Sequence, residues 1–238
     1  MITYFQSPSL LYYMTWITMG LTYFVVGGVM YLSIESGEFG RAVPNRFHPS
    51  QKMGREILLS LQTSFIMALY APILWYLYKE TTLTKIYLDI GDHGWLYFAG
   101  SIALMLLVQD VLFFLLHVIM HIRWVYPWTH KAHHQFMEPT PFGGFSFHFM
   151  EAALLISLFV VPPLLFPLHP AAIFIVQIFS IVWLVWLHSG REFSWLRPRH
   201  LDVFFSSTHH NIHHQNFKKN FGLYLSIWDK LIRAEAKS

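Results

Sequence analysis

Residues 96–121 read LYFAGSIALMLLVQDVLFFLLHVIMH, an apolar run that ends in two histidines four positions apart. About 20 helical residues cross the hydrocarbon core of a bilayer, so residues 96–120 predict a membrane span. His117 and His121 then share one face of the helix at its end, because residues four apart are neighbours on a helix surface. The stretch therefore predicts a membrane helix that presents two imidazoles at one membrane boundary.

The composition of the whole chain agrees with a membrane location. Of its 238 residues, 55% are hydrophobic and 12% are charged, whereas soluble domains carry about 25% charged residues. Cysteine is absent, which excludes disulfides, thiolate zinc sites and ordinary iron–sulfur clusters. The net charge of +3 is spread thinly and forms no basic stripe, so we expect no nucleic-acid partner.

Three other apolar regions predict how the chain crosses the bilayer. Residues 10–33 and 57–78 are each long enough for a span. Residues 152–188 are interrupted by four prolines, which predicts a helical hairpin that enters the membrane and returns. We therefore expect an all-α polytopic membrane protein with about three full transmembrane helices, a Pro-broken hairpin and a cytosolic helical cap. No repeat or polar linker divides it, so a single domain is expected over residues 1–238, with a histidine-rich core at about 96–231.

The positive residues predict which side of the membrane this cap faces. Of the 16 Lys and Arg residues, 14 lie in residues 34–56, 121–150 and 189–238, and Lys79 and Lys85 lie on the opposite side. Cytoplasmic loops carry an excess of Lys and Arg. We therefore expect the three segments, including the C-terminus, to face the cytosol.

Nine histidines on this predicted side repeat one spacing. They are His117 and His121, then His130, His133 and His134, then His188, and finally His210, His213 and His214. Spacings of three and four let one helical turn direct several nitrogens to one point. Neutral imidazole suits zinc, copper, iron and nickel, and a catalytic zinc usually needs only three protein ligands. The pattern therefore predicts a site for two metal ions with an almost wholly histidine shell.

The remaining histidines and the nearby carboxyls are interpreted separately. Expected in loops or at the membrane interface are His48, His93, His169 and His200. His209 stands four residues before His213 and could replace or assist its neighbour, and His148 is the other second-tier candidate. The candidates to orient a ligand imidazole from outside the metal shell are Asp110, Glu151 and Asp229. For the last two residues, capping of local structure is the competing interpretation.

In their order and flanking residues, these groups resemble the sterol desaturase and fatty acid hydroxylase superfamily, especially bacterial relatives of sterol C5-desaturases. The resemblance runs from about residue 55 to residue 231. It is carried by HVIMH (117–121), HKAHH (130–134), HSGRE (188–192), THHNIHH (208–214), NFGLY (220–224) and WDK (228–230). Leu184 stands where family members often have His or Asn. That difference predicts an open position or a water on one metal.

This resemblance implies a dioxygen-dependent di-iron enzyme that hydroxylates or desaturates a lipid or sterol-like substrate. The implied cofactors are two Fe²⁺ ions, which zinc could replace in a purified sample, and dioxygen. Electrons would come ultimately from NAD(P)H through a cytosolic cytochrome, ferredoxin or reductase. A bacterial inner membrane is expected in preference to the endoplasmic reticulum.

The substrate carbon must reach metals near the membrane surface, so an apolar tunnel that opens to the bilayer is expected between the spans. Its candidate wall residues are Phe113, Phe114, Phe145, Phe147 and Trp183, with plain helix packing as the competing interpretation for each. Two other classes of function remain open. One is an intramembrane metal transporter or sensor, although transport sites usually lie near the bilayer midplane. The other is a bis-histidine haem electron carrier, which leaves most of these histidines unexplained.

Overall fold

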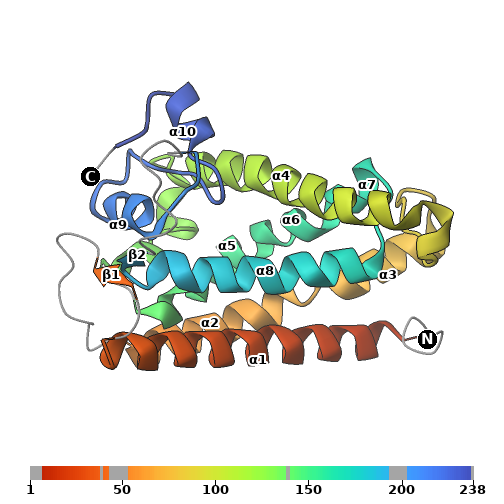
Figure 1. Cartoon of the computed structure of the whole chain (residues 1–238), viewed down its shortest axis with the longest axis horizontal. Coiled ribbons are helices and arrows are strands. Elements are labelled where there is room, and N and C mark those ends of the chain that lie inside the picture. Colours follow the sequence, from red (N-terminus) through yellow and green to blue (C-terminus); the bar gives the residue numbers. More distant parts are fainter. Residues whose placement is uncertain (1–6, 38–39, 43–52, 138–139, 193–202, 237–238) are drawn as a thin grey trace.

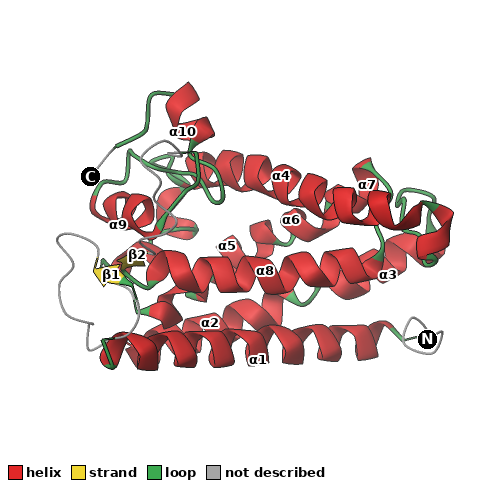
Figure 2. Cartoon of the chain, viewed as in Figure 1, coloured by secondary structure: helices red, strands yellow, loops and turns green. Residues whose placement is uncertain are grey.

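Four long apolar helices pack against one another and form the body of the molecule (Figure 1). The computed structural model describes residues 7–37, 40–42, 53–137, 140–192 and 203–236. The candidate spans are α1 (Pro8–Glu35), the run Met53–Glu80 made by α2 (Met53–Met67) and α3 (Tyr70–Glu80), α4 (Gly94–Met120) and α8 (Pro170–His188). Figure 2 shows that most of the described chain is helical. The chain is an all-α polytopic membrane protein, as the sequence predicts.

The second span is interrupted between α2 and α3, at residues 68 and 69. Pro72 explains this interruption. Proline has no N–H to donate, and its ring clashes with the carbonyl four residues earlier, here that of Ala68. The span predicted at residues 57–78 is therefore one membrane crossing made of two helices.

The Pro-rich region forms the predicted hairpin, with two unequal arms. Its first arm is divided into the short helices α5 (Phe149–Leu155), α6 (Ser157–Val160) and α7 (Pro162–Leu165). At the turn, Lys85 pairs with this region through Lys85 N–H to Pro163 O (2.7 Å) and Leu168 N–H to Lys85 O (3.2 Å). The returning arm is α8, which is 19 residues long and sufficient to span a bilayer on its own.

A cap covers the end of the bundle where α4 and α8 finish (Figure 1). We use this word for the described residues of 121–148 and 189–236. It contains the short 3-10 helices Tyr126–Trp128, His133–Gln135 and Pro141–Phe145, the helices α9 (Ser207–Gln215) and α10 (Ile227–Leu231), and strand β2 (Arg191–Glu192), which pairs antiparallel with β1 (Arg41–Ala42). Another 3-10 helix, Ile90–Asp92, lies before α4 at the opposite end.

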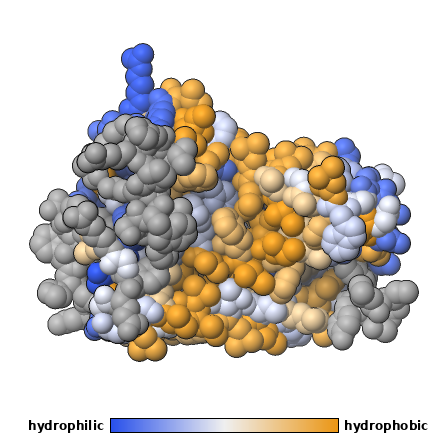
Figure 3. Space-filling model, viewed as in Figure 1, coloured by the Kyte–Doolittle hydropathy of each residue, from blue (hydrophilic) through white to orange (hydrophobic). Residues whose placement is uncertain are grey.

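The outside of the bundle is apolar, as a lipid-facing surface requires. The face in Figure 3 carries a broad hydrophobic area over the helices. On α1, Leu21 and Val25 are each 60% exposed. Exposed tryptophans mark both ends of α4: Trp95 at its start and Trp124 just beyond its end, 73% and 76% exposed. Tryptophan is enriched where membrane proteins meet the two bilayer interfaces, so these positions agree with a span between them.

Candidate metal centre

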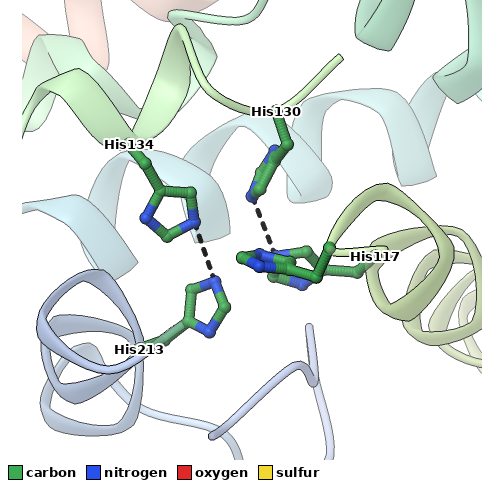
Figure 4. Close-up of side chains that lie close together, drawn as sticks. His117, His130, His134 and His213 are labelled. Atoms are coloured by element: carbon green, nitrogen blue, oxygen red, sulfur yellow. Dashed lines mark hydrogen bonds between the residues drawn. The ribbon is translucent and has the colours of Figure 1, made fainter. Parts of the chain in front are cut away.

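The nine histidines predicted as ligands lie together in two adjacent groups under the cap. Site A contains His117, His121, His130, His134 and His213. Site B contains His133, His188, His210 and His214. Within each site, one nitrogen from every histidine lies within 4.8 Å of all the others. Figure 4 shows four imidazoles of site A converging from α4, from the loop that follows it and from the segment of α9.

Neighbouring histidines are divided between the sites. His133 belongs to site B and His134 to site A, and on α9 His213 belongs to site A and His214 to site B. Successive residues on a helix point about 100° apart, since a turn holds 3.6 residues. A His-His pair on a short helix can therefore serve two ions lying side by side, and this is the local reason for the repeated His-x-x-His-His pattern.

Four imidazoles have their Nδ1 atoms fixed by backbone carbonyls. The pairs are His117 with Phe221 O (2.8 Å), His133 with Ser146 O (3.4 Å), His188 with Leu184 O (2.8 Å) and His213 with Lys219 O (2.6 Å). A carbonyl oxygen can only accept a hydrogen bond, so each Nδ1 carries the proton. In the neutral ring, Nε2 is then a bare lone pair that points into the site, which is the form that binds a metal.

These bare nitrogens face one another at short range. In site B, Nε2 of His188 lies 3.2 Å from Nε2 of His133 and 2.8 Å from Nε2 of His210. The His133–His188 contact cannot be an ordinary hydrogen bond, because both rings already use their proton at Nδ1. Both side chains are about 2% exposed, and a buried unpaired charge on either ring would be costly. A cation between the nitrogens removes the conflict, so the residues present fit a metal ion.

Site A also brings imidazole Nε2 atoms together at short range. Nε2 of His117 lies 2.9 Å from Nε2 of His130, and Nε2 of His134 lies 3.1 Å from Nε2 of His213, the two contacts dashed in Figure 4. The buried Nε2 of His121 has no hydrogen-bond partner among the described residues. An all-imidazole set of this kind suits iron, zinc, copper or nickel.

Burial keeps the cap histidines in the neutral form that a metal requires. Loss of solvation, assisted by nearby His213, lowers the pKa of His121 to about 3. Loss of solvation likewise lowers the pKa of His213 to about 4, although its bond to the Lys219 carbonyl acts in the opposite direction. A neutral imidazole needs no deprotonation before it binds a metal, so these two ligand candidates are already in the binding form well below neutral pH.

Glu151 on α5 supports a site A ligand from outside. Its Oε1 lies 2.6 Å from Nδ1 of His130, and the side chain is completely buried. A carboxyl in this position fixes the ring orientation and makes the imidazole a stronger ligand. Of the two roles considered for Glu151, orientation of a ligand imidazole is the one that this contact supports.

Asp110 takes a different position from the one predicted. It contacts no histidine among the described residues: its Oδ1 accepts from Tyr224 N–H (2.7 Å) and its Oδ2 from the indole N–H of Trp228 (2.6 Å). Seven residues of helix separate it from His117 by about 10 Å along the axis, which is too far for direct contact. Asp110 instead ties the cap to the middle of α4.

Asp229 acts as a local cap, the second role considered for it. Its carboxyl accepts from the N–H groups of Phe221 (2.7 Å) and Gly222 (2.9 Å). Burial raises the pKa of this carboxyl to about 6. Because the Phe221 carbonyl accepts from His117, Asp229 helps to orient a site A ligand through the backbone.

The two second-tier histidines lie outside both sites and cap helices. His209 forms a capping box with Ser206 at the start of α9, the helix that carries three of the ligand candidates. Nδ1 of His148 accepts from Met150 N–H (3.3 Å) at the start of α5. His93 and His169 lie at the opposite end of the bundle, before α4 and α8. His48 and His200 lie outside the described residues.

A narrow apolar cavity of about 20 Å³, room for roughly one water molecule, lies between the spans, beside both sites. Phe113 and Phe147 line it, and their rings lie 5.1 Å from the rings of His117 and His133, respectively. Phe145 lines it too, as expected. This volume is far below the about 300–1,000 Å³ typical of small-molecule pockets, so a lipid would enter only if the lining side chains moved apart.

Two of the five predicted wall residues are elsewhere. Phe114 follows Phe113 by one position and points away from the cavity, where it packs with Phe221. Trp183 donates its indole N–H to Leu223 O (2.7 Å) and lies outside the cavity lining, whereas its neighbour Leu184 lines it. The sequence did not predict the polar residues of the lining, which are Gln109, Gln177, Ser180 and Tyr224. Gln109 and Gln177, each an amide in an otherwise apolar span, could have signalled them.

Comparison with known proteins agrees with this arrangement. The fatty acid hydroxylase family model matches residues 102–234, which include every histidine of sites A and B. Lathosterol oxidase of Mus musculus is 34% identical over 151 residues, 62% of this chain and 50% of that protein. Lathosterol oxidase of Rattus norvegicus is 30% identical over 190 residues, 77% of this chain and 62% of that protein.

A Δ7-sterol 5(6)-desaturase of Schizosaccharomyces pombe is 29% identical over 222 residues, 93% of this chain and 65% of that protein. The chain thus spans between half and two thirds of the length of these curated relatives. No solved structure matches it. Because the family match covers more than half of its residues, the chain belongs to the fatty acid hydroxylase family, within the superfamily that includes the sterol desaturases.

Proposed function

We propose that this protein is a membrane oxidoreductase that uses two iron ions and dioxygen to desaturate or hydroxylate a sterol-like lipid. The observation that carries the proposal is the pair of histidine sites with facing Nε2 lone pairs beside a buried apolar cavity. An apolar molecule that opened this cavity would have a carbon one aromatic ring, that of Phe113 or Phe147, away from the imidazoles of His117 and His133. Hydroxylation and desaturation both begin at such a carbon.

In this proposal site A holds one iron with five histidines and site B holds the other with four. The chemistry that the iron pair supplies, with dioxygen and two external electrons, is removal of hydrogen from an unactivated C–H bond. Site B has one imidazole fewer, at the end of the helix where Leu184 stands in place of a further ligand. Its metal is therefore the one we expect to keep an open position.

The protein's own side chains position the reaction and keep water away from it. Phe113 and Phe147 separate the cavity from the imidazoles of His117 and His133 with apolar surface. Glu151 and the carbonyls of Phe221 and Leu184 hold three ligand rings by their Nδ1 atoms. Correct placement matters greatly, because an error of about 1 Å can reduce a rate about a hundredfold.

A sterol-like substrate is supported by the names of the relatives, which are lathosterol oxidases and Δ7-sterol 5(6)-desaturases. The cap is proposed to face the cytosol, on the positive-residue distribution, and to receive electrons there from a cytochrome, ferredoxin or reductase. The relatives named above come from mammals and a yeast, so they add no support to a bacterial inner membrane, which stays a prediction.

The two other classes of function have less support. A transporter site is expected near the bilayer midplane, whereas both histidine sites lie at the ends of α4 and α8. A bis-histidine haem would use two imidazoles and leave seven others facing one another. An absorption spectrum of the purified protein without a strong Soret band would exclude the haem carrier.

The test combines metal content with product analysis. The protein, purified in nanodiscs and supplied with ferrous iron, should bind two irons per chain. Together with a reductase system and dioxygen, it should convert a Δ7-sterol to a product that has lost two hydrogens or gained one oxygen, as read by mass spectrometry. Two bound irons with no change in any sterol would contradict the proposed substrate class, and a protein that binds no iron would contradict the whole proposal.

A further inference from the structure

One face of α2 carries polar side chains, although this helix forms part of a membrane span. Glu56, Ser60 and Thr63 follow one another at spacings of four and three, and each is at most 1% exposed. Residues at these spacings lie on one helix face, and we call the three residues the α2 stripe. Buried polar groups are costly unless they have hydrogen-bond partners, so the stripe needs partners inside the bundle.

The partner of the stripe is one irregular segment, residues 140–147, which we call the strap. Side chains of the stripe bond to its backbone near the start, in the middle and at the end. Buried peptide groups that lack a backbone partner can be satisfied by side chains in this way, so the stripe stabilises the irregular path of the strap. The three bonds are Thr140 N–H to Glu56 Oε1 (3.2 Å), the Ser60 hydroxyl to Phe142 O (3.1 Å) and Phe147 N–H to Thr63 Oγ1 (3.3 Å).

Tyr23 on α1 adds a fourth bond to the strap. Its hydroxyl donates to Phe142 O (2.7 Å), the carbonyl that also accepts from Ser60. A carbonyl oxygen has two lone pairs, so it can accept from both hydroxyls. Tyr23 and the α2 stripe all lie before residue 102, where the match to the family model begins. The first two spans therefore support the strap from outside the matched region.

The strap in turn contacts the surroundings of two ligand candidates of site B. Ser146 O lies 3.4 Å from Nδ1 of His133. Gly144 lies so close to Leu184 O that a Cβ would come within 2.7 Å of that oxygen, and Leu184 O lies 2.8 Å from Nδ1 of His188. Among the described residues, no hydrogen bond joins the strap to a histidine of site A.

We propose that the α2 stripe is a positioning element of site B, which acts through the strap on His133 and His188. The inference rests on the proposed function in requiring that sites A and B bind iron. A carbonyl that accepts from Nδ1 sets the orientation of the imidazole, so a shift of the strap changes the direction of Nε2 in site B. Site A takes its support from Phe221, Lys219 and Glu151 instead, so its own affinity should not depend on the stripe.

The experiment measures iron retention by the full chain in nanodiscs against increasing chelator, without turnover. Thr63→Val keeps the shape of the side chain and removes the hydroxyl, so Phe147 N–H loses its acceptor. Partners of metal-ligating histidines contribute about 10–100-fold to metal affinity. Since the stripe acts one step farther out, one of the two irons should be bound about tenfold less tightly, the lower end of that range. Thr63→Ser restores the hydroxyl and should return the parent curve.

Ser60→Ala and Ser64→Ala form a matched pair on the same helix. Both side chains are buried, but the Ser64 hydroxyl donates to Leu61 O of its own helix (2.9 Å). Ser60→Ala should release one iron at a lower chelator concentration than the parent. The change should be smaller than for Thr63→Val, because Tyr23 still donates to the same strap carbonyl. Ser64→Ala should follow the parent curve.

Combination with His214→Ala identifies the site that responds. This substitution removes a ligand candidate of site B, so the remaining iron reports on site A alone. Addition of Thr63→Val should leave the retention of that iron unchanged, which also shows that the protein is folded. An earlier loss of that iron, an early loss in Ser64→Ala, or parent curves for both Thr63→Val and Ser60→Ala overturns the role of the stripe while the proposed function stands. A parent that binds no iron overturns the proposed function, and this inference with it.

Discussion

Glu151 and His130 lie 2.6 Å apart in the buried interior, with the carboxyl on the side of the imidazole that faces away from site A. The second oxygen of Glu151 has no hydrogen-bond partner among the described residues. Besides a contact with the backbone N–H of His148 at the start of α5, the carboxyl is thus directed at one ligand candidate, His130. Such partners of metal-ligating histidines typically contribute 10–100-fold to metal affinity.

Glu151→Gln should therefore weaken iron binding at one of the two sites about tenfold or more, because the amide is a poorer acceptor for the Nδ1 proton of His130. The measurement is iron per chain against increasing chelator. The parent should lose its two irons at similar chelator concentrations, and the variant should lose one early. Superimposed curves for parent and variant would count against this role of Glu151.

His213→Ala and His214→Ala should each remove one of the two irons, since they belong to site A and site B, respectively. His148→Ala is the control, because this histidine lies outside both sites and caps α5. It should keep two irons and lose only about 1 kcal/mol of stability. Plasma emission gives the iron content, and an unchanged value for His213→Ala would refute its assignment.

Gly144→Ala should damage the cavity and site B together. A Cβ on Gly144 would lie 2.7 Å from Leu184 O, and the same oxygen accepts from His188 Nδ1. We expect a loss of about 1–3 kcal/mol in stability and weaker iron binding at site B. Gly100→Ala is the control, because a Cβ there has open space; its iron content should match the parent and its thermal midpoint should be no lower, since alanine favours a helix over glycine.

Asp110→Asn should loosen the cap without altering any ligand candidate. Asp110 is completely buried and accepts from two backbone N–H groups and the indole of Trp228. An amide has only one acceptor oxygen, so at least one buried donor loses its partner, at about 1–3 kcal/mol. The thermal midpoint should fall and limited proteolysis should begin in the cap, with Asp92→Asn as the exposed control. Cleavage at the parent rate would show that the network does not hold the cap.

The spacing of the histidines predicted which residues would gather, because helical periodicity is a local property. It did not predict that His133 and His134 serve different sites, since this depends on where α8 and α9 approach the same short helix. Asp110 illustrates the same limit. The sequence shows that Asp110 lies on the same helix face as His117. Its partners Tyr224 and Trp228, however, lie more than a hundred residues away in the sequence.

The spans could be predicted to within a few residues, because length and hydropathy determine them. The length of α8 was harder to predict, because the prolines before and at its start leave the turn of the hairpin undefined in the sequence. Phe113 and Phe114 project from different sides of α4. Hydropathy alone cannot predict which of two adjacent phenylalanines faces the cavity. Gln109, Ser180 and Tyr224 meet in the cavity wall from three distant segments, and no local pattern predicts that they meet.

The division of His133–His134 and His213–His214 between the two sites has a mechanical consequence. In each pair a single peptide bond joins a histidine of site A to a histidine of site B, so the backbone that positions one site also positions the other. A metal in either site would fix the backbone of both histidine pairs. The other site would then need less ordering to bind its own metal. In the parent, the second iron should accordingly bind at least as tightly as the first.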